Sequence, residues 1–206
     1  MTGPAGTGRW RILVTGVGGQ GVLSAGRWIG EAAAAGGFGM AVAELHGMSQ
    51  RGGSVQAEVA IGSARSPEIP DGMADALVAL EPMEAARALA KLSKRTTALV
   101  NTRPLLPVSL QSAGRPYPPL PSLIEPVREA AGSLIATDAT ALAERAGSPR
   151  ALNVVMLGML AGSGLLPFPG ERILDAILAG ALPALAVVTR NAFRLGMEAT
   201  QEAGAP

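Results

Sequence analysis

The segment "GVGGQG" at residues 16–21 constrains the fold of this chain more than any other stretch. It follows a short apolar run, "RWRILVTG", that is typical of a buried strand, and a segment with helical spacing extends to Gly37. Gly16, Gly18 and Gly21 satisfy the pattern G-x-G-x-x-G, which permits a tight turn, close approach of a ligand, and close packing of helix on strand. A strand, a glycine turn and a helix in this order predict an α/β fold.

The rest of the chain continues this alternation and then becomes helical. Further strands are expected at 38–44, 54–62, 75–80, 96–102 and 133–139, and helices at 19–37, 82–94, 123–132, 140–147, 150–162, 170–181 and 183–200. We expect a three-layer α/β sandwich around a mostly parallel, mixed sheet, with a Rossmann-like first βαβ unit and a helical C-terminal part. Residues 1–8 are expected to form a flexible tail, and residues 9–206 a single domain.

Only residues 45–53 separate the second and third expected strands. A crossover between parallel neighbours needs a dozen or more residues, so the strand at 54–62 is expected to run antiparallel to the second. This counts against a dinucleotide-binding fold, although Glu44 ends the second strand near the place where such folds put a ribose-binding acid.

Composition excludes several classes of function. The formal net charge is +1, which argues against binding nucleic acid by phosphate neutralisation and against a basic membrane-surface protein. There is no cysteine, so the chain has no thiol nucleophile and no thiolate ligands for an iron–sulfur cluster; a reducing cytoplasm is the expected compartment. The uncharged run at 151–170 is membrane-like in length, but Asn153, a Gly-Ser-Gly break and two prolines favour a buried helix and a turn.

The loop "HGMSQRGGS" between the second and third strands is unusually rich in hydrogen-bond donors and glycines. His46, the only histidine, can serve as a general base or donor, or as a structural histidine. Ser49 is a poor candidate nucleophile, because no G-x-S-x-G elbow is present. Arg51 suits a carboxylate or phosphate, or is an ordinary surface arginine. Beside the first glycine turn, these residues together favour a binding edge, although either turn can also be a plain corner that binds nothing.

These two motifs carry a resemblance to a known family. "ILVTGVGGQGVLSAGRWIGEAA" followed by "ELHGMSQRGGSVQAEVAIG" resembles the gamma module of the 2-oxoacid:ferredoxin oxidoreductases. Within that group the chain is most similar to the beta subunits of indolepyruvate ferredoxin oxidoreductases. The similarity covers nearly the whole chain after the tail, and neither motif departs from the family pattern.

The resemblance implies a division of labour between subunits. An alpha-type partner would carry thiamine diphosphate, magnesium and 4Fe-4S clusters, decarboxylate an aryl 2-oxoacid, reduce ferredoxin and form an acyl-coenzyme A. This chain would bind none of these cofactors alone and would have no catalytic or metal-ligating residue. Backbone amides of the glycine turn and Arg51 would hold coenzyme A phosphates or the lip of the partner's active site. The implied cofactor-binding residues are Gly16, Gly18, Gly19, Gln20, Gly21 and Arg51, and the implied interface residues are His46, Met48, Ser49, Gln50, Gly52, Gly53 and Ser54.

Two rival functions stay open at this point: a stand-alone NAD(P)- or flavin-dependent oxidoreductase that uses the glycine turn, and a nonenzymatic assembly protein. The proline-rich stretch at 103–122 is expected to be an extended segment, either a second contact with a partner or a connection over its own domain. The identity of the oxoacid, the stoichiometry of the complex and homodimer formation by the isolated chain are left open as well.

Overall fold

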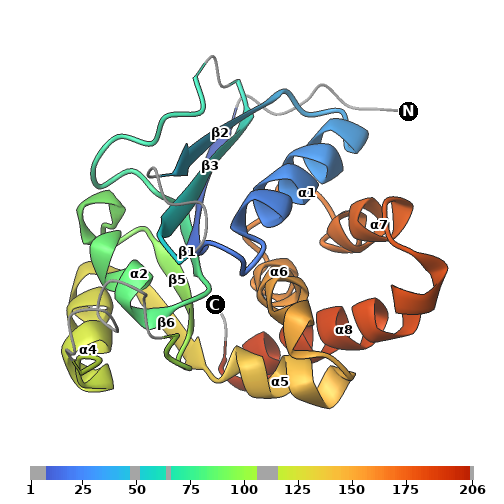
Figure 1. Cartoon of the computed structure of the whole chain (residues 1–206). Coiled ribbons are helices and arrows are strands. Elements are labelled where there is room, and N and C mark those ends of the chain that lie inside the picture. The colour runs from blue at the N-terminus through green and yellow to red at the C-terminus, as the bar shows by residue number, and fades with distance from the viewer. Residues whose placement is uncertain (1–7, 47–51, 64–65, 106–115, 205–206) are drawn as a thin grey trace.

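The computed structural model describes residues 8–46, 52–63, 66–105 and 116–204 (Figure 1). The strands are β1 (Arg9–Val17), β2 (Met40–His46), β3 (Ser54–Gly62), β4 (Ala76–Ala79), β5 (Thr97–Asn101) and β6 (Ser133–Thr137). The α-helices are α1 (Val22–Ala35), α2 (Pro82–Arg87), α4 (Leu120–Ala130), α5 (Ala139–Ala146), α6 (Leu152–Gly162), α7 (Glu171–Ala179) and α8 (Ala186–Glu202). Short 3-10 helices span Leu89–Lys91, Pro149–Ala151 and Pro183–Leu185.

The strands form one mixed sheet in the order β2-β3-β1-β4-β5-β6. β1, β4, β5 and β6 pair in parallel, whereas β3 is antiparallel to both β1 and β2. The antiparallel pairing expected from the short loop between β2 and β3 is therefore confirmed. β1, α1 and β2 form a βαβ unit with parallel strands, but β3 lies between those strands, where a Rossmann unit would have none.

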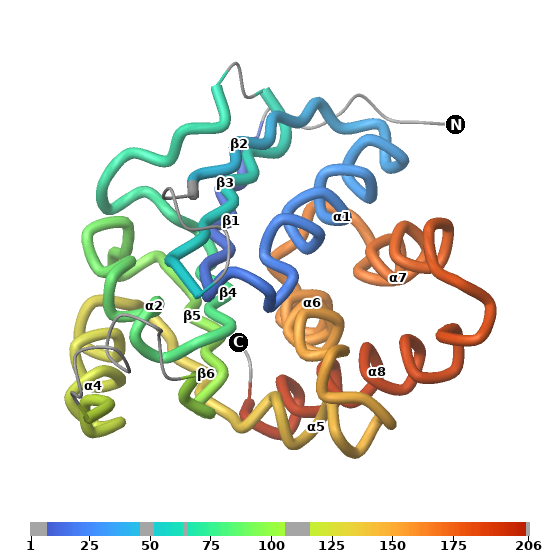
Figure 2. The backbone as a smooth tube through the Cα atoms, viewed as in Figure 1, coloured from blue at the N-terminus to red at the C-terminus, as the bar shows by residue number. Residues whose placement is uncertain are grey.

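Helices cover both faces of the sheet, and the expected three-layer α/β architecture is confirmed (Figures 1 and 2). One core contains Val14 of β1, Val59 of β3 and Leu99 of β5, together with the buried faces of α1, α5, α6, α7 and α8. The other core contains Leu13 and Leu77, packed against α2 and α4. Alternate residues of β1, β4 and β5 supply the two cores, as the two-residue period of a strand requires.

The expected helix at 82–94 is shorter than predicted, because α2 ends at Arg87 and only a 3-10 turn follows. The loop before β4 accounts for this early end. Gly72 N–H donates to the carbonyl oxygen of Ala90 at 2.8 Å, and Ala74 N–H donates to that of Lys91 at 3.0 Å. The carbonyl groups of Ala90 and Lys91 therefore accept hydrogen bonds from this loop, whereas in a continuing α-helix they would accept from N–H groups four residues further along the chain.

Two other expectations need correction nearby. The proline-rich stretch at 103–122 was expected to be extended, but its last three residues open α4; Pro121 stands in the first turn, where a missing N–H costs little. The strand expected at 133–139 ends at Thr137, because the next residue, Asp138, caps α5: its carboxylate accepts from Ala141 N–H at 2.9 Å.

The apolar run at 151–170 contains the buried helix α6, as expected. Nine of its residues are buried, because α6 lies between the sheet and α8. Glycines allow that close approach: a Cβ on Gly158 would collide with the carbonyl oxygen of Phe193, and one on Gly196 with that of Val155. No helix in the described part of the chain is long and apolar enough to cross a membrane.

The contact between α6 and α8 yields a stability prediction. Gly158→Ala should lower the free energy of unfolding by about 1–3 kcal/mol, because the new methyl group forces the helices apart. Gly180→Ala is the matched control, since a Cβ there meets nothing within 4 Å. Urea unfolding of both variants tests this, and equal stability of the two would contradict the close packing described above.

Candidate functional site

The carboxyl edge of the parallel strands brings together the two motifs singled out in the sequence. The turn after β1 and the loop before β3 are joined by two backbone hydrogen bonds. Gly18 N–H donates to the carbonyl oxygen of Gly53 at 2.8 Å, and Gly52 N–H donates to that of Gly18 at 3.4 Å. Gly52 has a φ of 76°, a conformation that glycine adopts without strain. The glycine turn and the end of the histidine loop therefore form one continuous edge.

Gly16 and Gly21 of the turn must each be glycine for a distinct local reason. A Cβ on Gly16 would lie 2.9 Å from both Gln20 Oε1 and Val22 Cγ2, so this corner admits no side chain. Gly21 caps α1 with a φ of 83°, and a Cβ there would collide with the Asn153 amide of α6. The expected close approach at Gly21 is thus to α6 rather than to a strand.

The amide of Gln20 ties the ends of the central strands together. Its Oε1 accepts from Val17 N–H at 2.8 Å, and its Nε2 donates to the carbonyl oxygen of Leu80 at 3.1 Å. The same carbonyl accepts from Nδ2 of Asn101, which is fully buried, at 2.9 Å. Nδ2 of Asn101 also donates to Thr140 Oγ1 at 3.1 Å. These contacts hold the ends of β1, β4 and β5 and the start of α5 in one network.

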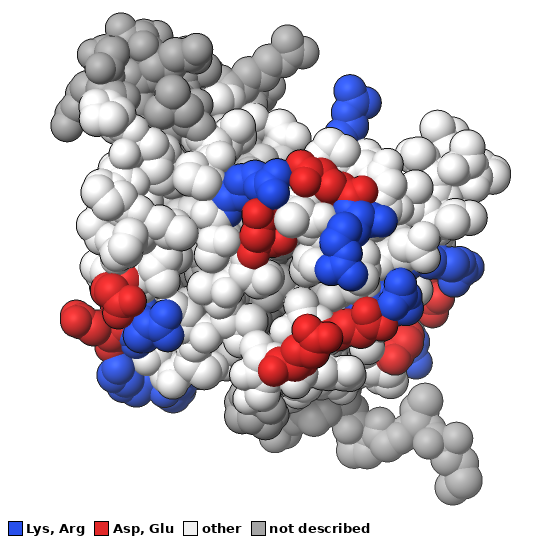
Figure 3. Space-filling model, turned by 90° about the horizontal axis from the view of Figure 1, so that it is seen from below, with Lys and Arg blue, Asp and Glu red and all other residues white. Residues whose placement is uncertain are grey.

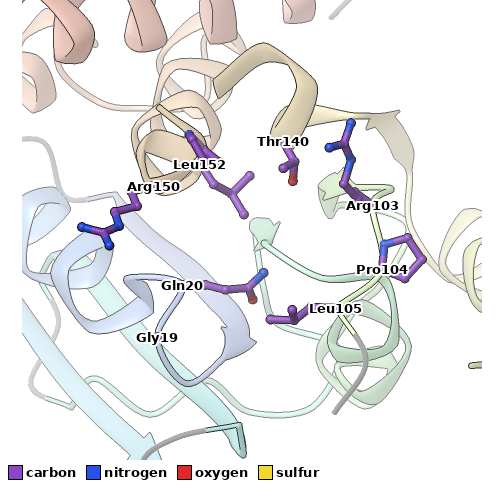
Figure 4. A pocket seen from close by; sticks show the side chains of 9 residues that line it. Gly19, Gln20, Arg103, Pro104, Leu105, Thr140, Arg150 and Leu152 are labelled. Atoms are coloured by element: carbon purple, nitrogen blue, oxygen red, sulfur yellow. The ribbon is translucent and has the colours of Figure 1, made fainter. Parts of the chain in front are cut away.

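A cavity of about 430 Å³ opens at this edge (Figure 4). In Figure 4, Gln20, Leu105, Thr140 and Leu152 surround it, whereas the guanidinium of Arg150 points away. Its lining residues are Gly19, Gln20, Arg103, Pro104, Leu105, Thr140, Pro149, Arg150 and Leu152. A second hollow of about 240 Å³ lies against Gly18, Gly19 and Gly21 at the start of α1. The carboxyl edge of an open α/β sheet is where ligands of such folds generally bind.

Arg103 at the cavity rim is held by two carboxylates. Its guanidinium donates to Asp138 at 2.8 Å and to Glu144 at 2.7 Å. The hydrogen bond to Asp138 raises the pKa of Arg103 above its ordinary value. Partial burial alone would raise the pKa of Asp138, but the hydrogen bonds from Arg103 and Ala141 N–H and the positive charge of Arg103 outweigh it and lower that pKa. Because its charge is balanced, Arg103 is better suited to shape the rim than to bind a free anion.

Glu81, directly after β4, has a completely buried side chain. Its Oε2 caps α2, accepting from Met83 N–H at 2.7 Å and Glu84 N–H at 3.1 Å. Its Oε1 accepts from Leu105 N–H at 3.3 Å and from the Tyr117 hydroxyl. Burial, together with the hydrogen bond to Glu81, raises the pKa of Tyr117, which therefore stays protonated and acts as a donor.

Glu84, one turn further along α2, is also buried, with 1% of its side chain exposed. Its Oε2 accepts from Ser54 Oγ at 2.5 Å, and its Oε1 accepts from Arg87. Burial raises the pKa of Glu84, although the hydrogen bonds from Ser54 and Arg87 oppose the shift. Glu84 thus fixes the first residue of β3, where the histidine loop ends.

The structure places only some of the predicted residues. His46 ends β2, opposite Val55 in the strand register. Gly16, Gly18, Gly19, Gln20, Gly21, Gly52, Gly53 and Ser54 gather at the carboxyl edge. Met48, Ser49, Gln50 and Arg51 lie outside the described residues.

Sequence reasoning missed the polar residues that organise the edge. These are Glu81, Glu84, Asn101, Arg103, Tyr117, Thr140 and Asp138. The pair Glu81-Pro82 marks the helix start that the sequence predicts at residue 82, but the capping role of Glu81 was not recognised. The other residues carry no periodic signal, because each acts through a partner far away in the sequence.

The geometry of this edge suits binding rather than proton transfer. Among the described residues, the carboxylates of this edge are engaged: Glu81 by backbone N–H groups and a hydroxyl, and Glu84 by Ser54 and Arg87. At the cavity rim, Asp138 and Glu144 are engaged by Arg103. The described residues also contain no group of three or more His, Asp or Glu side chains placed to hold a metal ion. On the face shown in Figure 3, basic and acidic side chains are interspersed, which is unlike the basic patch of a nucleic-acid-binding surface.

The ion pair at the cavity rim predicts a pH-dependent stability difference. Asp138→Asn keeps an oxygen to cap α5 but loses the charge that faces Arg103, so it should lower Tm by roughly 1–3 °C at pH 7. The folded pKa of Asp138 is lowered, so its stabilisation is present above the ordinary aspartate pKa and is lost as pH falls through the lowered value. Thermal unfolding of both proteins between pH 7 and pH 3 should show converging Tm values. A Tm difference that stays constant between pH 7 and pH 3 would show that the charge of Asp138 does not stabilise the fold through Arg103.

Comparison with known proteins agrees with this architecture. The sequence profile of the pyruvate ferredoxin/flavodoxin oxidoreductase family matches residues 11–199. The chain is 44% identical over 169 residues to the indolepyruvate oxidoreductase subunit IorB of Archaeoglobus fulgidus, covering 82% of this chain and 84% of the relative. It is 39% identical over 193 residues to the protein of the same name from Methanothermobacter thermautotrophicus, covering 94% of this chain and 98% of the relative.

A solved structure shares the fold. The pyruvate oxidoreductase subunit PORC of Thermotoga maritima superposes with a TM-score of 0.66 at 25% identity, covering 92% of this chain and 96% of that chain. The family match extends over almost all of the sheet and helices described above. This chain belongs to the pyruvate ferredoxin/flavodoxin oxidoreductase family.

Proposed function

We propose that this chain is the subunit without redox cofactors of a 2-oxoacid:ferredoxin oxidoreductase whose oxoacid is indolepyruvate or another aryl pyruvate. The single observation that carries the proposal is near full-length identity of 44% and 39% to proteins named as indolepyruvate oxidoreductase subunits. The complex would oxidatively decarboxylate the oxoacid to an acyl-coenzyme A and reduce ferredoxin.

The chemistry would reside in an alpha-type partner subunit. That partner would supply thiamine diphosphate, magnesium and 4Fe-4S clusters, because this sequence has no cysteine thiolate to ligate a cluster. The present chain would contribute a shaped edge beside the partner's reaction centre. The backbone hydrogen bonds that join Gly18 to Gly52 and Gly53 support this role, since they bring the glycine turn and the end of the histidine loop to the same edge of the sheet.

Coenzyme A is the ligand for which this edge has the best-matched groups. Its phosphates are anions, and the start of α1 beside Gly19 and Gly21 presents backbone amides at a hollow of about 240 Å³. The N–H of Gly18 is engaged by Gly53 and so contributes to the shape of the edge instead. Arg51 would complete the site with a guanidinium that can bind phosphate in two-pronged fashion.

The rival function, a stand-alone dinucleotide-binding oxidoreductase, fits the strand order poorly. In a dinucleotide fold the acid that binds the ribose ends the strand beside β1. Here Glu44 lies on β2, and β3 separates β2 from β1, which moves the acid away by a further strand spacing of about 4.8 Å. Flavin or nicotinamide absorbance in the purified chain would favour this rival.

Reconstitution with the partner tests the proposed function. Co-expression with a thiamine-binding, cysteine-rich partner should give reduction of ferredoxin or a viologen dye that depends on thiamine diphosphate, coenzyme A and oxoacid. Indolepyruvate and phenylpyruvate should be used faster than pyruvate, and either subunit alone should give no turnover. Turnover by this chain alone would sink the proposal.

Arg51→Ala tests the coenzyme A site within that complex. Loss of a charged hydrogen bond to phosphate should raise the KM for coenzyme A by roughly ten- to a hundred-fold while leaving kcat for oxoacid-dependent dye reduction much less affected. Arg190→Ala is the control, because Arg190 is an exposed arginine on α8. Equal KM values for both variants, with normal assembly, would show that Arg51 does not contact coenzyme A.

A further inference from the structure

Residues 80–84, which follow β4 and begin α2, collect contacts from four separate chain segments; we call them the 80–84 hub. The Leu80 carbonyl oxygen accepts from Gln20 at 3.1 Å and from Asn101 at 2.9 Å. β4 is a central strand, so hydrogen bonds to β1 on one side and to β5 on the other hold it in place. The hub is therefore well placed to hold segments that have no strand or helix of their own.

The first such segment follows β5. The Glu81 carboxylate receives the N–H of Leu105, at 3.3 Å, and the hydroxyl of Tyr117 on the same oxygen. Leu105 is one of the residues that line the cavity (Figure 4). One buried carboxylate thus sets the position of the outer wall of the cavity.

The second segment is the end of the histidine loop. Ser54 donates to Glu84 at 2.5 Å, and the preceding residue, Gly53, accepts from the turn at Gly18. Glu84 therefore fixes the residue at which the loop joins β3. Glu81 is the N-cap of α2 and Glu84 lies three positions later in its first turn, so the start of one short helix carries both carboxylates.

We propose that Glu81 and Glu84 are positioning residues, which hold the cavity wall at Leu105 and the loop end at Ser54 in the geometry that the partner subunit and coenzyme A meet. This inference rests on the proposed function of the edge. Neither glutamate can touch a partner directly, because the side chain of Glu81 is fully buried and only 1% of that of Glu84 is exposed. Any effect of either on binding must pass through the segment that it holds.

Substitution by glutamine separates positioning from packing. Glu81 and Glu84 each use both carboxylate oxygens as acceptors. A glutamine keeps the shape, but an NH2 group at position 81 cannot accept from the Leu105 N–H. At position 84 it replaces the charge-assisted hydrogen bond from Ser54 by a weaker neutral one. Glu58→Gln is the matched control: Glu58 is a buried glutamate that accepts from Ile69 N–H at 2.7 Å and lies opposite Leu13, in the middle of β1.

Hydrogen exchange of the purified full chain tests the anchoring without any partner. Glu84→Gln should speed exchange about ten-fold in the peptide that contains Ser54, and Glu81→Gln should do so in peptides that contain Leu105 or Tyr117. Glu58→Gln should leave all of these peptides unchanged. Unchanged exchange at Ser54 in Glu84→Gln and at Leu105 and Tyr117 in Glu81→Gln would overturn the proposal, whether or not the chain is an oxidoreductase subunit.

The reconstituted complex tests the consequence. Both hub variants should weaken binding to the partner or raise the KM for coenzyme A roughly ten-fold, with kcat at saturation nearly retained, whereas Glu58→Gln should match the parent. Ser54→Ala should reproduce the defect of Glu84→Gln, and the double variant that carries both substitutions should be no worse than either single variant. Ser54→Thr, which keeps a hydroxyl, should behave like the parent. Additive defects, or equal defects in Glu58→Gln, would mean that the hub acts through general stability only.

The two proposals fail in different ways. If the parent pair gives no oxoacid-dependent reduction, the proposed function is wrong, while the exchange experiment still decides the anchoring. If the parent pair is active and both hub variants behave like Glu58→Gln, the proposed function stands and the positioning role is wrong.

Discussion

The antiparallel pairing of β3 with β1 determines where the candidate contact segments lie. Its register runs without a break from Arg9 opposite Gly62 to Val17 opposite Ser54. Because β3 begins at the level where β1 ends, the loop that precedes it must arrive beside the glycine turn. A slip of one residue would turn Val55 and Val59 away from the core under α1, so burial enforces this register strongly.

The same core shows how a chain with 3% aromatic residues fills its interior. Glycine and alanine let neighbouring helices and strands pack with their backbones close together, so few large side chains are needed between them. A Cβ on Gly26 of α1 would lie only 2.7 Å from the Cβ of Ala57 on β3, and Gly158 and Gly196 play the corresponding role between α6 and α8. Tight backbone packing of this kind tolerates few substitutions, which ties the position of α1 and the adjoining glycine turn to the sheet.

Strand and helix positions could largely be predicted because apolar periodicity is local information. β3 matches its expected range of 54–62, and the short connection before it was enough to predict its direction. The early end of α2 could not be predicted, because carbonyl groups of Ala90 and Lys91 are held by a loop that precedes β4. The contacts of the hub were equally hidden, since Ser54 and Glu84 are 30 positions apart in sequence.

Burying two carboxylates is a costly way to stabilise a fold, and apolar residues of similar volume often serve as well. Apolar contacts have no preferred direction, whereas a hydrogen bond fixes the orientation of the group that donates it. Leu105 is exposed and Ser54 is only partly buried, so packing alone does not fix either in one position. Hydrogen bonds to a rigid acceptor supply the missing direction, and the helix start at Glu81 lowers the cost because backbone N–H groups already solvate that charge. The polar residues of this edge therefore shape it, and the side chains that meet a ligand or partner can remain few.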